Sequence, residues 1–180
     1  MLVIATRHHE HSEQVIAGLK AGKHVFVEKP LATTWAQLDE IQAFLDAQMN
    51  MPMLMVGFNR RFSPAMQTLK QQVSNRKSPL MIQYRLNGGY IAAKHWVQTE
   101  QGAGRNIGEA CHMYDCFRYL TGAPVCEINA TAINPADSIY QRNDNFVATL
   151  RYEDGSVATL TYTALGPKNG LAKEQVEVFC

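Results

Sequence analysis

The first 58 residues alternate short apolar runs with longer segments that carry one apolar face. The apolar runs lie at residues 1–6, 24–27 and 53–58. Short continuous runs of this kind are typical of buried strands. The segments between them place apolar residues at three- and four-residue steps, which is the spacing of an amphipathic helix. The order strand, helix, strand, helix, strand predicts parallel strands joined by crossover helices.

Local signals mark the ends of the two predicted helices. Gly22 follows the first helix, predicted over residues 12–21, as a C-terminal stop. Thr34 and Gln37 have the spacing of a capping box at the start of the second helix. Three- and four-residue steps along this second helix predict a single apolar stripe, formed by Trp35, Leu38, Ile41 and Leu45.

The pattern changes after residue 62. Ser63 and Pro64 predict the start of a helix, because proline is favoured at the first helical position after a serine cap. Alternating apolar and polar positions predict half-buried strands at residues 80–86 and 146–152. Further elements are predicted in order: a helix at 107–120, a hairpin turn at 153–156, and strands at 157–164 and 174–179. This half therefore predicts an antiparallel sheet with one or two helices on a face.

Composition and charge narrow the class of protein. The chain has 180 residues, 46% hydrophobic and 18% charged, with a net charge of +1, so nothing favours a nucleic-acid partner. No apolar run approaches the roughly 18 residues of a membrane span, and the N-terminus has no signal-peptide pattern. Its four cysteines form no C-x-x-C pair, which is typical of free thiols in a cytoplasmic protein.

Polar residues gather at the three predicted strand ends. In open parallel sheets, ligands bind beyond the carboxyl ends of the strands. Those ends carry Thr6-Arg7-His8-His9, Glu28-Lys29-Pro30 and Asn59-Arg60-Arg61. Proline is tolerated because the strand has ended, and the Lys29–Pro30 bond is a candidate for the cis form. Two interpretations stay open from chemistry alone, a functional crevice or a surface loop with an incidental ion pair.

The histidine-rich stretch after the first strand invites a metal interpretation. His8, His9, Glu10 and His11 are all potential zinc ligands. Their spacing is not H-E-x-x-H, and no ordered scaffold is evident before Ser12. We therefore predict no native metal site, and with it no metal-dependent hydrolase.

Three longer motifs resemble one enzyme family. AGKHVFVEKPLATT follows an IAT strand end and the loop histidine His11, VGFNRRFSP comes next, and GAGRNIGEACHMYDCFRYLTGAP comes third. In this order and spacing they resemble the Gfo/Idh/MocA family of NAD(P)-dependent oxidoreductases, from residue 1 to about 165. The resemblance implies an α/β protein in which a remnant of a Rossmann-type parallel sheet precedes an α+β domain with a mostly antiparallel sheet. Residues 1–62 would be the C-terminal part of the dinucleotide-binding domain, and 63–180 a truncated substrate and oligomerisation domain.

The family resemblance also implies a reaction and its catalytic residues. The usual reaction moves a hydride between the nicotinamide of NAD or NADP and a secondary hydroxyl carbon of a sugar, nucleotide sugar or inositol-type substrate. Lys29 matches the E-K-P lysine beside the reacting hydroxyl, where it takes the proton or polarises the oxygen. His112 matches the acid–base histidine, and Glu109 is a third catalytic candidate. The resemblance implies cofactor contacts from Thr6, His8, His11, Glu28, Lys29 and Pro30.

Substrate contacts follow from the same resemblance and from spacing. Arg61 matches the family arginine, with a surface salt bridge as its alternative. Trp96 offers a flat apolar surface to a sugar ring, with core packing as its alternative, and Lys94 lies two residues before it. Asp115 shares a helix face with His112 at i+3 and is expected to hydrogen-bond it.

Two departures from the family pattern affect these assignments. Many members carry an aspartate four residues before the helix histidine, where this chain has Gly108, with Glu109 one step later. A helix turns about 100° per residue, so Glu109 need not point where that aspartate would. No G-x-G-x-x-G fingerprint for pyrophosphate occurs, and the chain opens on what resembles the family's fourth strand. We therefore expect an internal fragment without tight dinucleotide binding.

A fragment of this kind exposes a strand edge. Leu2, Val3 and Ile4 are expected at that edge, which another copy of the chain would cover. We therefore predict a homodimer or a higher homo-oligomer, with a sugar or polyol as the small-molecule partner and no nucleic-acid or membrane partner. The alternative function is a non-catalytic remnant that folds and oligomerises through its sheet domain.

Overall fold

A computed structural model describes residues 1–48, 50, 52–133, 139–167 and 169–180. It divides into two compact units. The first unit comprises Met1–Phe58 and Lys94–Cys111, and the second comprises Asn59–Ala93 and His112–Cys180. The sequence predicted a single division at residue 62, and it did not predict that residues 94–111 would return to the first unit. The division at residue 62 stays a prediction about the family's domains.

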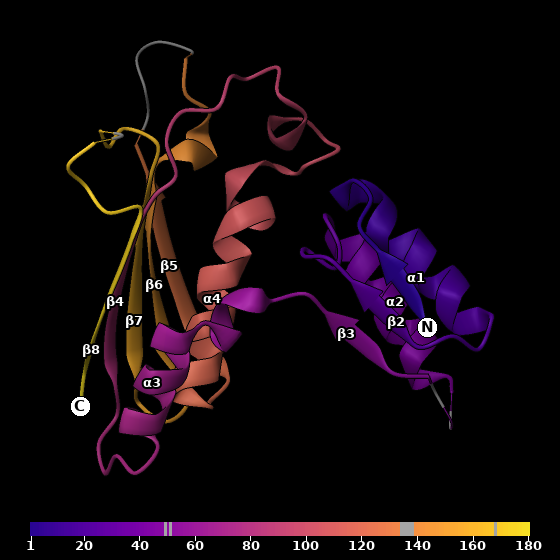
Figure 1. The fold of residues 1–180 in the computed structure, drawn as a ribbon, viewed down its shortest axis with the longest axis horizontal. Helices are drawn as coiled ribbons and strands as arrows, with labels where there is room; N and C mark the ends of the chain where they lie inside the picture. Colours follow the sequence, from indigo (N-terminus) through magenta and orange to yellow (C-terminus); the bar gives the residue numbers. More distant parts are fainter. Residues whose placement is uncertain (49, 51, 134–138, 168) are drawn as a thin grey trace. The chain divides into compact units, whose positions relative to one another are not determined.

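The first unit is built on a three-stranded parallel sheet. Its strands are β1 (Leu2–Ile4), β2 (Val25–Val27) and β3 (Leu54–Val56), in the order β1-β2-β3. Helices α1 (His11–Lys20) and α2 (Trp35–Asp46) connect them (Figure 1). The parallel alternation predicted for residues 1–58 is confirmed. The histidine stretch is ordered, contrary to expectation, because the 3-10 helix η1 (His8–Glu10) leads directly into α1.

One face of this sheet is covered and the other is open. Side chains from the strands and from both helices form the core, which contains Ile4, Val15, Leu19, Val25 and Val27. On the opposite face, Val3, Phe26 and Met55 lie in register across the three strands. Val3 is 59% exposed and Met55 is 49% exposed. The edge position predicted for residues 2–4 is confirmed, since β1 has a neighbour on one side only.

The apolar stripe predicted for α2 is only partly buried. Ile41 is 2% exposed, whereas Trp35 is 82% exposed and Leu38 is 38% exposed. A helix of 12 residues is about 18 Å long, while a three-residue strand covers about 10 Å. The helix therefore extends beyond the strands that would cover its first turn. The predicted cap is present, because Thr34 Oγ1 accepts a hydrogen bond from the Gln37 amide at 3.2 Å.

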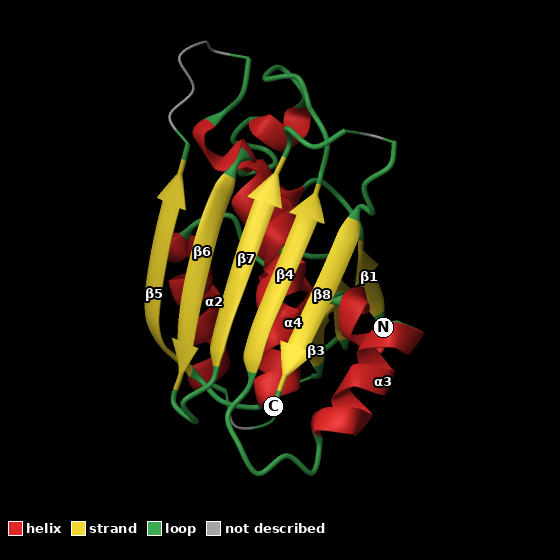
Figure 2. Ribbon diagram, turned by 90° about the vertical axis from the view of Figure 1, so that its left-hand side faces the viewer, coloured by secondary structure: helices red, strands yellow, loops and turns green. Residues whose placement is uncertain are grey.

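The second unit packs helices against a five-stranded sheet. Its strands are β4 (Met81–Asn87), β5 (Val125–Ala132), β6 (Phe146–Tyr152), β7 (Val157–Thr163) and β8 (Glu174–Phe179). The strand order is β5-β6-β7-β4-β8, and only β4 and β7 run parallel (Figure 2). The predicted mostly antiparallel sheet is confirmed. The hairpin predicted at 153–156 joins β6 to β7, with Gly155 at a φ of 83°.

Helices and turns complete the second unit. They are η2 (Asn59–Phe62), α3 (Pro64–Val73), α4 (Cys111–Thr121) and η5 (Arg142–Asp144). The Ser63 hydroxyl accepts a hydrogen bond from the Met66 amide at 3.3 Å, which confirms the predicted start of α3. The buried side of α4 carries Phe117, whose ring meets Tyr84 of β4 edge-on with 6.1 Å between ring centres. Among the described residues, no helix is long and apolar enough to cross a membrane.

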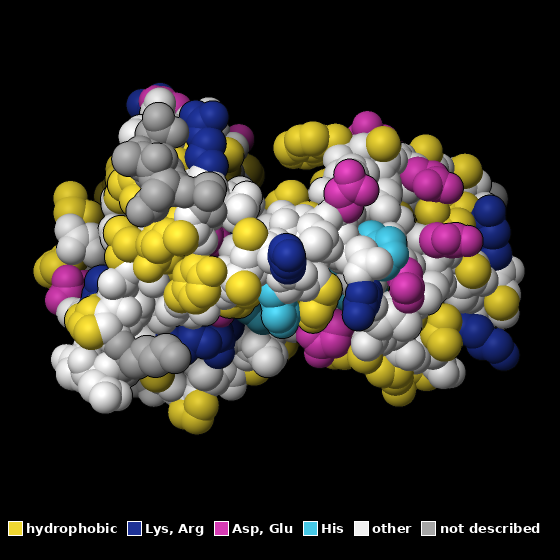
Figure 3. Space-filling model, turned by 90° about the horizontal axis from the view of Figure 1, so that it is seen from above, with side chains coloured by type: hydrophobic (Ala, Val, Ile, Leu, Met, Phe, Trp, Pro, Cys, Tyr) yellow, Lys and Arg dark blue, Asp and Glu magenta, His cyan; other side chains and the backbone are white. Residues whose placement is uncertain are grey.

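The segment that returns to the first unit is irregular. It holds the short turns η3 (Trp96–Gln98) and η4 (Asn106–Ala110), and η4 is π-helical. The helix predicted over 107–120 therefore consists of a π-helical turn that continues into α4. Such turns are frequent at functional sites. Charged side chains of both signs are interspersed on the face of the first unit seen in Figure 3 (right).

Candidate active site

The carboxyl ends of β1 and β2 are joined by a buried histidine. His11 is fully buried. Its Nδ1 lies 2.7 Å from the carbonyl oxygen of Pro30, and its Nε2 lies 3.2 Å from that of Thr6. Both ring nitrogens therefore face backbone carbonyl oxygens. The ring thus fixes the E-K-P turn against the end of β1, and the Lys29–Pro30 bond is cis, as the sequence allowed.

Glu28 and Lys29 leave β2 in different surroundings. The Glu28 amide donates to the Ile4 carbonyl at 2.9 Å, which continues the β1–β2 pairing by one residue. A Cβ atom at Gly57 would lie 3.3 Å from Glu28 Oε1 and 3.2 Å from the Phe26 ring, so glycine at that position gives the carboxylate room. Lys29 Nζ donates to the carbonyl oxygen of Gly108 at 2.7 Å.

Three further hydrogen bonds join residues 94–111 to the end of β1 and to η1. The His9 amide donates to the Gln101 carbonyl at 3.2 Å. Arg7 donates to the side-chain oxygen of Gln101. His8 Nδ1 lies 2.9 Å from the carbonyl oxygen of Gly102. Gly102 itself has no room for a side chain, because a Cβ there would lie 2.3 Å from the Val97 Cα. The glycine-rich turn is therefore packed backbone against backbone.

His8 lies at the centre of this cluster. It is 7% exposed, and its ring meets Trp96 edge-on with 4.9 Å between ring centres. Burial lowers the pKa of His8, its bond to Gly102 works in the opposite direction, and the positive charge of Lys29 lowers the pKa further. The neutral ring therefore carries its proton on Nδ1, which donates to Gly102. The Arg7 guanidinium lies 5.6 Å from the centre of the Trp96 ring.

The structure corrects the expected partner of Asp115. Its carboxylate pairs with Arg61 and not with His112: Arg61 Nε donates to Oδ2 at 2.8 Å, and Nη2 donates to Oδ1. The planar guanidinium makes two parallel bonds, a stronger arrangement than a single imidazole bond. The bond to Asp115 raises the pKa of Arg61. The ion pair that was left open as an alternative for Arg61 is present, and it is partly buried.

The three other predicted residues lie in separate surroundings. Glu109 accepts a hydrogen bond from Arg105 Nη2 at 3.1 Å, and the Arg105 side chain is only 1% exposed. This placement favours a counter-ion role for Glu109, and its catalytic role stays a prediction. Lys94 is exposed at the start of the returning segment. His112 is 6% exposed near the start of α4 in the second unit.

Sequence reasoning missed two groups of contacts. The Gly108 carbonyl gives no signal in the sequence, because any residue has one. The second group lies at Glu174, whose carboxylate accepts from Tyr84 OH and from Arg60 Nη2, both at 2.7 Å. Tyr84 and Glu174 are 90 residues apart in the chain. Only the pairing of β4 with β8 brings them together.

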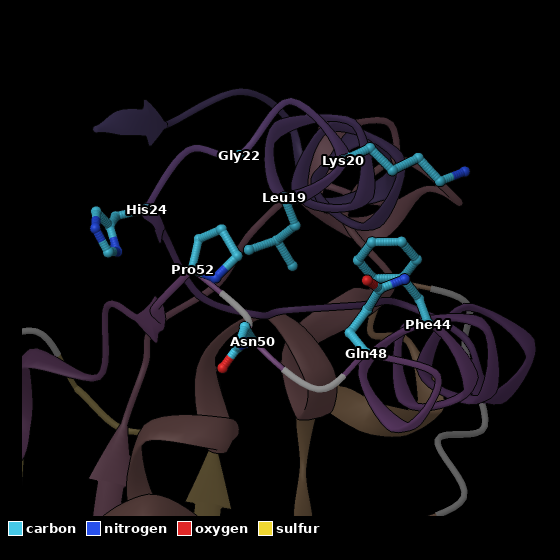
Figure 4. A pocket seen from close by; sticks show the side chains of 8 residues that line it. All are labelled: Leu19, Lys20, Gly22, His24, Phe44, Gln48, Asn50 and Pro52. Carbon is cyan, nitrogen blue, oxygen red and sulfur yellow. The ribbon is translucent and has the colours of Figure 1, made fainter.

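A hollow in the first unit lies at the opposite ends of the strands. Its volume is about 650 Å³. Residues before β2 and β3 and at the ends of α1 and α2 form its walls, namely Leu19, Lys20, Gly22, His24, Phe44, Gln48, Asn50 and Pro52 (Figure 4). The Lys20 ammonium lies 5.7 Å from the centre of the Phe44 ring. The hollow holds none of the predicted site residues.

Comparisons with known proteins identify the family. Residues 1–58 match the model described as "Oxidoreductase family, NAD-binding Rossmann fold", and residues 69–180 match "GFO/IDH/MocA C-terminal domain". The chain is 30% identical to the oxidoreductase YrbE of Bacillus subtilis over 83% of this chain and 44% of that protein. It is 29% identical to myo-inositol 2-dehydrogenase of Thermotoga maritima over 88% of this chain and 48% of that protein.

A solved structure supports the same grouping. The WlbA dehydrogenase of Bordetella pertussis, in complex with NADH and UDP-GlcNAcA, matches with a TM-score of 0.79 and 25% identity over 97% of this chain and 56% of that one. The chain spans about half the length of the relatives that it matches. The two family matches together span both units, and the chain therefore belongs to the GFO/IDH/MocA family of oxidoreductases.

Proposed function

We propose that the chain carries the nicotinamide- and substrate-facing part of an NAD(P)-dependent dehydrogenase that acts on a secondary hydroxyl of a sugar, nucleotide sugar or inositol-type substrate. The observation that carries this proposal is the placement of Lys29, whose Nζ is held 2.7 Å from the Gly108 carbonyl beyond the carboxyl end of β2. The relatives named above include an inositol dehydrogenase, and they do not favour a non-catalytic remnant.

The residues at the strand ends fit the nicotinamide half of the cofactor. The Glu28 carboxylate, with Gly57 opposite it, offers acceptors suited to ribose hydroxyls. Thr6, His11 and Pro30 hold the strand ends around it. The sequence has no G-x-G-x-x-G, the loop that in such domains approaches the pyrophosphate. When bound, NAD or NADP supplies hydride transfer, and the residues of this chain supply orientation and proton handling at the nicotinamide end.

Oxidation of a secondary alcohol also requires that the hydroxyl proton leave. In this proposal Lys29 takes that proton or, held by the Gly108 carbonyl, orients and polarises the hydroxyl oxygen. His112 is the other proposed acid–base group, on the basis of the family resemblance. Trp96 and Lys94 remain the proposed substrate contacts. Arg61 and Asp115 pair with each other, so we assign them to holding η2 against α4.

We also propose a homodimer or a higher homo-oligomer. Two open faces support it: the in-register row Val3, Phe26 and Met55, and the exposed side of the five-stranded sheet. Light scattering on the protein as it elutes from a gel-filtration column would measure its mass in solution. A monomer at all concentrations tested would refute this part of the proposal.

The experiment for the function is a titration of the chain with NADH and NADPH, read by nicotinamide fluorescence and by heat. Binding in the micromolar range would mean that the cofactor crevice is completed despite the missing glycine loop, and turnover of inositols or sugars that Lys29→Ala abolishes would then support the proposal. Lys23→Ala is the matched control, since Lys23 is an exposed lysine before the same strand. No binding up to millimolar cofactor would refute autonomous dehydrogenase activity.

A further inference from the structure

Three elements of the first unit meet at Gly108. Lys29 comes from the end of β2, His8 comes from η1, and Gly108 belongs to the π-helical turn η4. The Gly108 carbonyl accepts from Lys29 Nζ at 2.7 Å. A Cβ atom at Gly108 would lie 3.1 Å from His8 Cε1 and 3.1 Å from the Gly102 carbonyl oxygen. At these distances a side chain at position 108 would fit only if the imidazole ring and the Gly102 carbonyl shifted by a few tenths of an ångström.

We propose that His8 is a positioning residue for Lys29, and that Gly108 lacks a side chain because the His8 ring occupies its place. The functional part rests on the proposed role of Lys29 as the base of the dehydrogenase. The structural part, that the ring holds the turn which holds the ammonium, does not depend on catalysis.

The contacts form a continuous chain from His8 to Lys29. The ring is fixed at Nδ1 by the Gly102 carbonyl and along its edge by Trp96. The ring and the Gly102 carbonyl oxygen both lie close beside Gly108, each 3.1 Å from where a Cβ would be. In the proposal this packing sets the direction of the Gly108 carbonyl, and that carbonyl sets the position of Lys29 Nζ. A side chain at position 8 that cannot donate to the Gly102 carbonyl would leave the turn free to relax.

The same packing accounts for the glycine at position 108. A larger residue there, such as aspartate, would place its Cβ 3.1 Å from the ring and 3.1 Å from a backbone oxygen. The backbone oxygen cannot move without shifting the turn. Histidine at position 8 and glycine at position 108 are therefore a matched pair, and neither should tolerate change while the other is kept.

Charge couples the same residues. The titratable groups that act on the charge of His8 are Lys29 from β2 and His9 and His11 from its own segment. A protonated His8 would place a second positive charge beside the Lys29 ammonium and weaken its hold on the turn. Because burial, and after it the charge of Lys29, lowers the pKa of His8, the ring is neutral near pH 7.

The first test observes Lys29 directly in the full chain. Side-chain ammonium signals in ¹H–¹⁵N spectra persist when a hydrogen bond slows exchange. The Lys29 signal should be present in the wild type, retained in His8→Asn, whose amide reaches the Gly102 carbonyl, and lost in His8→Leu. His9→Asn, a neighbour in the same turn, is the control and should keep it. An unchanged signal in His8→Leu would overturn the proposal.

A double-mutant cycle gives a second test, which can be carried out even if the Lys29 ammonium signal is not observed in any variant. Gly108→Ala should lower the melting temperature by several degrees in the wild type and by clearly less in the His8→Ala background, because the ring is gone. Equal losses in both backgrounds would refute the matched pair. Lys29→Met should also raise the measured pKa of His8, because a positive charge is removed, and no rise would count against the coupling.

Activity separates this proposal from the proposed function. If the chain turns over substrate, His8→Leu should lower kcat on the order of 10- to 100-fold with little change in KM, since a misplaced base loses rate more than binding. If the chain is inactive but the ammonium signal and the cycle behave as stated, the dehydrogenase assignment fails and the positioning stands. If turnover is normal in His8→Leu, the positioning fails and the assignment stands.

Discussion

The pair formed by Arg61 and Asp115 makes a quantitative prediction for Asp115→Ala. The carboxylate is 8% exposed and accepts two bonds from one guanidinium. Two charge-assisted bonds at about 1.5 kcal/mol each would sum to roughly 3 kcal/mol. The Arg61 side chain is 32% exposed, so water replaces part of what it loses. We therefore expect the free energy of unfolding to fall by about 2 kcal/mol.

The assay must report on the second unit. Both tryptophans, Trp35 and Trp96, lie in the first unit, so far-UV circular dichroism in urea is the better probe. With a slope of about 2 kcal/mol per molar urea, the midpoint should drop by about 1 M. Arg118→Met, which changes an exposed arginine on the same helix, is the control and should shift stability by less than about 0.5 kcal/mol.

A double-mutant cycle decides whether the loss belongs to the pair. Arg61→Met, Asp115→Ala and the double variant should give a coupling energy of about 2 kcal/mol. Additive effects within about 0.5 kcal/mol would refute the reasoning, because the two residues would then stabilise the unit through different partners.

Three further predictions follow from buried and paired groups in the second unit. Burial acts to raise the pKa of Asp154, but bonds from Ser156 and Arg76 outweigh it and hold the pKa below the ordinary 3.8. The stability from this carboxylate is therefore full above that value and is lost as pH falls through the lowered pKa, so the midpoint difference between wild type and Asp154→Asn should be larger at about pH 5 than at about pH 2. An equal difference at both would contradict it. Burial raises the pKa of Cys116 to about 12, so iodoacetamide at mildly alkaline pH should label exposed Cys126 and Cys180 in the native protein and Cys116 only after unfolding, as peptide mass spectrometry would show; native labelling of Cys116 at a similar rate would refute its burial. Tyr152 is 1% exposed and its hydroxyl has no hydrogen-bond partner among the described residues. The free energy of unfolding of Tyr152→Phe should therefore be unchanged or higher by up to about 1 kcal/mol. A decrease of more than about 1 kcal/mol would mean that the hydroxyl has a partner.

Much of the local structure follows from the sequence. Thr34 and Ser63 act as helix caps because their side-chain oxygens satisfy amides within three residues, and such signals are short-range. The alternation of apolar and polar residues predicted the strands correctly for the same reason, since it also depends only on residues close together in the chain. The exposure of Trp35 could not be read this way, since a stripe shows which side of a helix is apolar but not how far the neighbouring strands extend.

The site was harder to predict than the fold. The strand ends and Lys29 lie where the parallel alternation places them. No periodic pattern in the sequence predicts that residues 94–111 return to the first unit. The return depends on contacts with backbone carbonyls, such as that of His8 with Gly102, and every residue has a carbonyl. The prediction that Asp115 bonds to His112 was wrong for a related reason. Helical spacing identifies neighbours on one helix but not Arg61, which is 54 residues away in the chain.

The place of β4 in the sheet has a consequence for synthesis on the ribosome. Both of its neighbours, β7 and β8, come from the last part of the chain, and Val157 follows Asn87 by 70 residues. At about 5–20 residues per second, β4 waits roughly 4 to 14 s after it is made before β7 begins to exist. During that time its backbone has no strand on either side. We expect residues 81–87 to be the segment of the nascent second unit that a ribosome-associated chaperone protects.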